Sequence, residues 1–80
     1  MTKQQANKEE HWQHVAPAFR GSGWSVRRHG AHRATRIFET KAEAVAFARK
    51  LAKKAGSELY IHGRDGMITD TDSYEYMNER

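Results

Sequence analysis

The chain has 80 residues, 38% of them hydrophobic and 30% charged, with a formal net charge of +4 and no cysteine. This length suffices for one small domain, and the apolar content excludes wholesale disorder. Without cysteine there is neither a disulfide framework nor a thiolate metal site. No apolar run is long enough for a secretion signal or a membrane span, so we expect a cytoplasmic protein that does not engage membranes.

The first residues predict an arm followed by a strand. Residues 1–11 are polar and lack a repeating apolar face, so we expect a frayed N-terminal arm. Pro17 would interrupt a helix, and the residue before a proline is biased toward extended backbone. We therefore predict a short edge strand at residues 13–16.

A β-hairpin is predicted next. Trp24 and Val26 alternate with polar residues, which is typical of a strand with one buried face. After a turn that contains Gly30, residues 34–40 are rich in β-branched and aromatic types and supply the partner strand.

The clearest element is an amphipathic helix. Thr40 followed by Glu43 forms a capping box, apolar residues then recur at helical spacing, and Gly56 is a C-terminal stop. A strand at residues 58–62 then leads to an Asp-Gly turn and a second hairpin. Beyond it, Tyr74 or Tyr76 is expected to dock on the sheet.

These elements define a single small α+β domain at residues 12–74. Its expected order is (β)ββαββ, with a four- to five-stranded sheet and one helix packed on one face. An acidic C-terminal tail follows at residues 75–80. The predicted core consists of Val15, Trp24, Val26, Phe38, Val45, Ala48, Leu51, Ala52, Leu59, Ile61 and Ile68.

The other face of the sheet should be left without a helix. Ile37 and Phe38 point to opposite faces of their strand, so one of them is expected on the uncovered face. We expect it to form a modest apolar patch there with Trp12 and Tyr60, a feature that often marks self-association.

Positive charge is concentrated in the first hairpin. Residues 20–36 contain five arginines, two histidines and no acid, whereas residues 70–80 are predominantly acidic. A basic β-ribbon suits a phosphate backbone, which predicts a nucleic-acid surface. Alternation along the strands allows at most two or three of its arginines to share one face. The predicted nucleic-acid-binding residues are Arg20, Arg27, Arg28, Arg33 and Arg36.

Several short motifs follow one another in a distinctive order between residues 12 and 74. They are a Trp-x-Val strand (Trp24, Val26) with an Arg-Ala pair (Arg33, Ala34), a Thr-Lys-x-Glu-Ala helix start (Thr40, Lys41, Glu43, Ala44) with an Ala-Arg pair (Ala48, Arg49), and Ile-His-Gly-x-Asp-Gly (Ile61, His62, Gly63, Asp65, Gly66), flanked by His14, Val15, Pro17 and Tyr74. In this order the chain resembles a family of small bacterial and phage proteins, domain of unknown function 2188 (DUF2188). The resemblance implies a compact sheet-and-helix domain of cytoplasmic bacterial origin, and it implies no activity.

The five histidines invite a metal interpretation. His11 with His14, and His29 with His32, lie close enough in sequence to approach one ion, but neither pair has a third ligand at a recognised spacing. We therefore expect no metal site and no cofactor. The simpler interpretation is that the histidines lie exposed in turns, except for one strand histidine that bonds to the backbone.

A catalytic interpretation is also weak. The best set combines His62 and Asp65 with Tyr60 and Arg33, but three residues of separation make a local Asx turn the more economical role for Asp65. Chains this short rarely build a closed pocket, so we expect no enzyme.

Two function classes remain. The first is a non-catalytic nucleic-acid-binding accessory module that uses the basic hairpin to bind DNA or RNA. The alternative is a protein-interaction or homo-oligomerising module of bacterial or phage origin, which would contact an acidic protein or a second copy of itself and have no nucleic-acid role.

Overall fold

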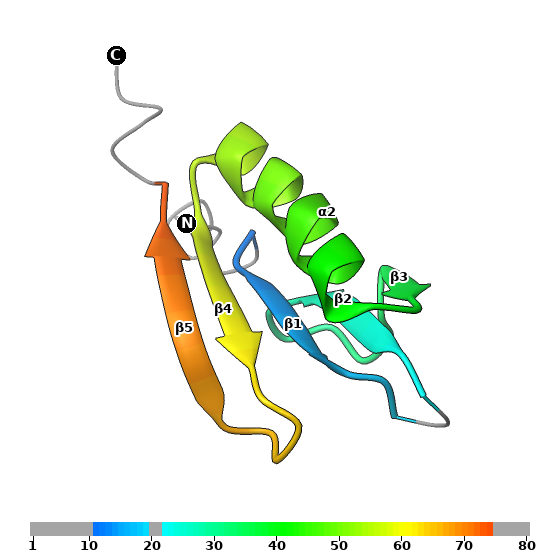
Figure 1. Cartoon of the computed structure of the whole chain (residues 1–80). Helices are drawn as coiled ribbons and strands as arrows, with labels where there is room; N and C mark the ends of the chain where they lie inside the picture. Colours follow the sequence, from blue (N-terminus) through cyan, green and yellow to red (C-terminus); the bar gives the residue numbers. More distant parts are fainter. Residues whose placement is uncertain (1–10, 20–21, 75–80) are drawn as a thin grey trace.

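The computed structural model of the chain describes residues 11–19 and 22–74. Its elements are β1 (Gln13–Pro17), β2 (Trp24–Arg28), β3 (Arg36–Phe38), helix α2 (Lys41–Ala55), β4 (Glu58–His62) and β5 (Ile68–Ser73). The five strands form one sheet in the order β3-β2-β1-β4-β5, and α2 lies across one face of it (Figure 1). The predicted α+β class and element order are confirmed.

Strand β1 is the middle strand of the sheet, so its prediction as an edge strand was wrong. It pairs antiparallel with β2 and parallel with β4. Pro17 does not prevent this because it is the last residue of β1, so its missing N–H leaves the pairing of the preceding residues with β2 and β4 in place. The backbone pairing resumes at Ala18, whose N–H donates to the carbonyl oxygen of Gly23 at 3.0 Å.

Helix α2 begins and ends where the sequence predicted. The hydroxyl oxygen of Thr40 accepts the N–H of Glu43 at 3.2 Å, and Oε1 of Glu43 accepts the N–H of Thr40 at 3.3 Å. Gly56 ends the helix in the left-handed conformation, with φ of 66°. The fully buried residues of α2, which face the sheet, are all small: Ala44, Ala48 and Ala52.

The core lies between α2 and the three middle strands. Most predicted core residues pack there, although Phe38, Val45 and Leu51 are only partly buried. Ile68 was predicted wrongly: it lies on the edge strand β5 beside a register shift and is 52% exposed. The predicted strand at residues 34–40 forms only over its three middle residues.

Tyr74 docks on the core, as predicted, while Tyr76 lies outside the described residues. Nε of Arg49 donates to its hydroxyl oxygen at 3.1 Å, and NH2 of the same arginine reaches Asp72 at 3.3 Å. The bond to Tyr74 is the main cause of a raised pKa for Arg49. This contact ties α2 to β5. Neither part of the described chain contains a helix long and apolar enough to cross a membrane.

Candidate nucleic-acid interface

Alternate residues of the middle strands point away from α2. The core residues of β1, β2 and β4 pack beneath the helix, so the residues next to them in sequence lie on the opposite face of the sheet. In the described chain no helix covers that face. We call it the open face. It carries His14 and Ala16 from β1, Ser25 and Arg27 from β2, and Tyr60 and His62 from β4.

Three histidines form a hydrogen-bonded chain on the open face, which we call the histidine chain. Nδ1 of His14 is 3.0 Å from Nε2 of His62, and Nε2 of His14 is 2.9 Å from Nδ1 of His29. Nδ1 of His62 in turn lies 2.9 Å from the carbonyl oxygen of Gly66. Strand register brings the rings together, because His14 pairs with Tyr60, two residues before His62.

The carbonyl at one end fixes the direction of these hydrogen bonds. Because the oxygen of Gly66 can only accept, Nδ1 of His62 carries a proton, and Nε2 of the neutral ring is then an acceptor. His14 therefore donates from Nδ1 to His62 and accepts at Nε2 from His29. With all three rings neutral, every bond of the chain is made, and Nε2 of His29 is the acceptor at its exposed end.

The surroundings of His14 keep its ring neutral. Burial is the main reason why the pKa of His14 is lowered to about 4, because a charged imidazole loses solvation there. Positive charge on His62, His29 and Arg27 acts in the same direction. A proton added to the chain is therefore held at an end rather than at the middle ring.

Two larger rings extend the histidine chain into an aromatic cluster. Tyr60 stacks beside His14 with ring centroids 5.2 Å apart. Trp12 packs edge-on against Tyr60 at 5.5 Å and against His29 at 5.0 Å. The predicted patch is thus confirmed for these two residues, while Ile37 lies apart from them at the β3 edge. Nε1 of Trp12 is buried with no hydrogen-bond partner within the described ranges.

A groove of about 440 Å³ adjoins the aromatic cluster on the open face. It combines basic side chains with apolar ones, and these are Arg27, His32, Arg33, Pro17, Phe19 and Ile37. Phe19 is 94% exposed and Ile37 is 54% exposed. The groove lies beside the cluster because Arg27, which lines the groove, is the register partner of His14.

The predicted arginines divide between the two faces of the sheet. Arg27 and Arg33 line the groove. Arg28 and Arg36 point to the side that carries α2, since Arg28 comes two residues after the buried Val26 and Arg36 is the register partner of Val26. Arg20 lies outside the described residues. Of the five predicted arginines, the structure therefore brings two together on the open face, Arg27 and Arg33.

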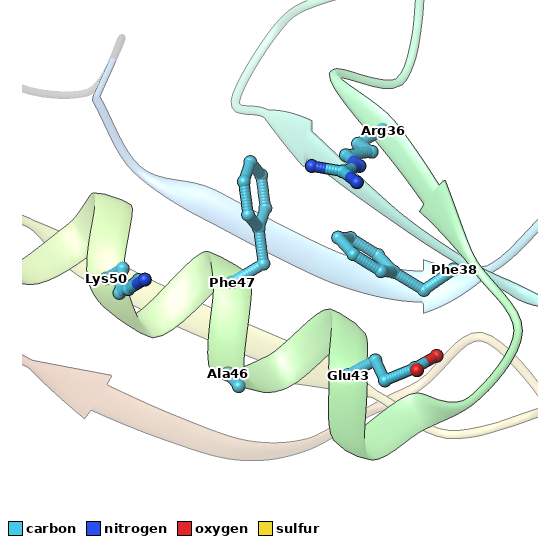
Figure 2. A pocket seen from close by; sticks show the side chains of 6 residues that line it. All are labelled: Arg36, Phe38, Glu43, Ala46, Phe47 and Lys50. Atoms are coloured by element: carbon cyan, nitrogen blue, oxygen red, sulfur yellow. The ribbon is translucent and has the colours of Figure 1, made fainter.

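Arg36 belongs to a second pocket, of about 420 Å³, between β3 and α2 (Figure 2). Its guanidinium carbon lies 5.1 Å from the ring centre of Phe38 and 5.5 Å from that of Phe47, so the cation contacts both π-faces. Both rings pack on the core. Lys50 and Glu43 complete the lining, and Glu43 is held by the helix cap. Arg36 thus covers the end of the core.

The residues considered for metal or acid–base chemistry have local partners. Oδ1 of Asp65 accepts the N–H of Met67 at 3.0 Å, which is the predicted Asx turn. In the part of the chain that the structure describes, no three histidine, cysteine or acidic residues are grouped to hold a metal ion. The histidine chain does not qualify because His14 meets its neighbours through nitrogens on opposite sides of its ring, so the rings cannot converge on one ion.

Sequence reasoning missed the histidine chain. Proximity suggested the pairs His11–His14 and His29–His32, whereas the observed partners are 15 and 48 residues apart. One signal was present: His14 and His62 both alternate with buried residues and therefore lie on the uncovered side of their strands. The register that makes them neighbours depends on the parallel pairing of β1 with β4.

The fold and this site define a small α+β domain whose helix covers one face of a five-stranded mixed sheet, and whose open face carries histidines, aromatic rings and arginines. The chain belongs to the family described as an uncharacterized protein conserved in bacteria (DUF2188), which matches residues 13–74. Both the resemblance found in the sequence and its bacterial affiliation are confirmed.

A bacterial relative shares part of this sequence. The chain is 39% identical over 46 residues to the uncharacterized protein YdaT of Bacillus subtilis (strain 168). The match covers 58% of the chain and 31% of YdaT, so the chain spans less than a third of that relative's length. No solved structure matches the chain.

Proposed function

We propose that the protein is a non-catalytic, cytoplasmic module that binds a single strand of nucleic acid on its open face. One observation carries the proposal: the aromatic cluster and the arginine-lined groove occupy the same uncovered face and meet where His14 pairs with Arg27. Sites for single strands combine a positively charged groove with aromatic side chains on which bases stack. The basic hairpin contributes Arg27 and Arg33 to this surface.

The geometry favours a single strand over a duplex. The rings of Tyr60 and His14 are half-buried in the sheet surface, where they can contact an unpaired base but cannot enter a groove of a double helix. Strands β2 and β4 are separated by one strand, or about 10 Å, so phosphate and base contacts lie within reach of one short segment.

Salt dependence of binding tests the phosphate contacts. We expect a labelled 15-nucleotide oligonucleotide to bind, with log affinity falling linearly with log salt. The double change Arg27→Ala with Arg33→Ala should shallow this slope by about 1.4, that is, about 0.7 for each lost phosphate contact. Lys53→Ala with Lys54→Ala removes the same charge from the helix and should leave the slope unchanged. No binding at low salt, or equal effects of both pairs, contradicts the proposal.

Exposed apolar residues favour a second candidate, a protein-interaction or self-associating module. Phe19 and Ile37 are both more than half exposed and line the same groove. An apolar contact would not weaken with salt as a phosphate contact does. Analytical ultracentrifugation of the wild type and Ile37→Asp at low and high salt tests it. A salt-insensitive dimer that Ile37→Asp dissociates would support this candidate, and a monomer throughout would oppose self-association.

A further inference from the structure

We propose that the histidine chain makes binding on the open face proton-linked: it takes up one proton without breaking a hydrogen bond, and the added charge strengthens the hold on nucleic acid as the pH falls. This inference rests on the proposed function and names its regulation.

The proton count follows from the geometry. Two links join the three rings, and each link holds one proton when its hydrogen bond is made. A third proton lies on Nδ1 of His62, facing the carbonyl oxygen of Gly66. The remaining nitrogen, Nε2 of His29, has no hydrogen-bond partner among residues 11–19 and 22–74, so one further proton is accepted there with every bond retained.

A second added proton does not fit. When the chain already carries one added proton, each ring nitrogen without a proton accepts the N–H of a neighbouring ring. A further proton on either of these nitrogens would set two N–H groups against each other and break that hydrogen bond. The chain therefore has two states that keep its geometry, neutral and singly charged. In the charged state the proton can pass inward, because shifting the proton in both links moves the charge from His29 to His62 without losing a bond.

The groups that face the histidine chain do not neutralise the added charge. Arg27 approaches from β2, His62 and Tyr60 come from β4, and Trp12 packs from the segment before β1. Within the described residues no carboxylate bonds to the chain, and Asp65 of the nearby turn uses Oδ1 for the N–H of Met67. The added charge thus has no counter-ion bonded to it among the described residues, and a phosphate on the open face would supply one.

The position of His29 makes the charge useful. His29 is exposed, directly follows β2 and contacts Trp12. It is bonded to His14, which is the register partner of Arg27. A cation there extends the row formed by Arg27 and Arg33 across the aromatic cluster. One additional phosphate contact should steepen the salt slope by about 0.7 on a single strand.

The first measurement follows the chain without nucleic acid. In protein with ¹⁵N-labelled histidine, NMR should show at pH 8 the Nδ1–H tautomer for all three rings. Between pH 8 and pH 5 the three together should take up one proton, with the hydrogen bonds retained. Uptake of two or three protons over this range, or other tautomers at pH 8, would overturn the proton count.

The second measurement compares binding of the 15-nucleotide strand at pH 7.5 and pH 5.5. It is made in a His32→Gln background, because His32 lines the groove and would add its own charge. We expect the salt slope to steepen by about 0.7 at pH 5.5, and His29→Gln, which keeps a donor but cannot be protonated, to remove this change. His11→Gln, outside the chain, should retain it.

The two measurements separate the possible failures. Binding with the same slope at both pH values, together with the expected NMR titration, would overturn the proton linkage and leave the proposed function standing. The expected titration with no binding at any salt would show that the chain exists but that the proposed function is wrong.

Discussion

The lowered pKa of His14 links the stability of the folded sheet to pH. Both ring nitrogens of His14 are engaged, and its pKa is lowered to about 4 from the ordinary 6.5. In the folded state it therefore stays neutral at pH values where the unfolded chain has already bound a proton. Its contribution to stability is complete above pH 6.5 and is lost as the pH falls from there toward 4.

We expect His14 to account for a loss of about 1–2 kcal/mol of unfolding free energy between pH 7 and pH 4. The full shift would correspond to about 3 kcal/mol, but the ring is half-exposed and solvent screens part of the effect. Urea denaturation at both pH values measures the loss. His14→Gln does not titrate and should show a smaller loss, so an equal pH dependence in both proteins would refute this role.

Gly23 has a backbone conformation and surroundings that both oppose a side chain. Its φ is +116°, and a Cβ there would lie 2.8 Å from the carbonyl oxygen of Phe38. At Gly30, φ is also positive, at +82°, but a Cβ would meet no atom within 4 Å. We expect Gly23→Ala to cost roughly 3 kcal/mol and Gly30→Ala roughly 1 kcal/mol. Thermal denaturation compares them, and similar losses would mean that the contact with Phe38 does not matter.

At the scale of elements, local signals decide what can be predicted. Helix α2 is marked at both ends by residues within a few positions of one another, Thr40 with Glu43 and then Gly56, so its prediction was correct. Strand β3 is shorter than its composition suggested, because only three of its residues pair with β2. β-Propensity identifies segments that fit a sheet and does not say how many residues find a partner.

The helix start gives a test at this scale. Thr40→Ala removes the oxygen that accepts the N–H of Glu43, so we expect a loss of about 1 kcal/mol in unfolding free energy. Thr35→Ala is the matched control, since Thr35 is exposed in a loop and the bond it makes, from its backbone N–H to the carbonyl oxygen of Val26, is kept in the variant. Chemical denaturation of both variants decides the matter. A loss no larger than that of the control would place the cap elsewhere.

The open face depends on pairing between distant segments, which limited its prediction. Alternation correctly placed Trp24 and Val26 inside, and it correctly warned that the hairpin arginines would not all share a face. It could not show that β1 lies between β2 and β4, and without that order His14 has no visible connection to His29 or His62. Long-range register is set by the whole core, so no local pattern encodes it.

For the whole molecule, one thin core supports five strands. A chain of this length buries a smaller fraction of its surface on folding than a larger domain does, so the loss of one large core side chain removes much of its stability. Leu59 is fully buried, whereas Leu51 is only partly buried.

Leu59→Ala should therefore cost about 3–5 kcal/mol and leave the protein largely unfolded at 37 °C. Leu51→Ala should cost about half as much, because solvent already reaches part of its side chain. Circular dichroism melting curves of the two variants give the comparison. If Leu51→Ala proves the more damaging change, the packing of α2 on the sheet differs from that described.

The central place of β1 also affects how the chain folds as it is synthesised. Its antiparallel partner β2 follows closely, but its parallel partner β4 comes only after α2. A nascent chain that has emerged as far as β3 can form the first three strands, yet the apolar side of Val15 and Val26 stays exposed until the helix follows. Non-local pairing of this kind raises contact order and slows folding. The middle of the sheet, although β1 leaves the ribosome before the other described strands, is completed only when residue 62 has emerged.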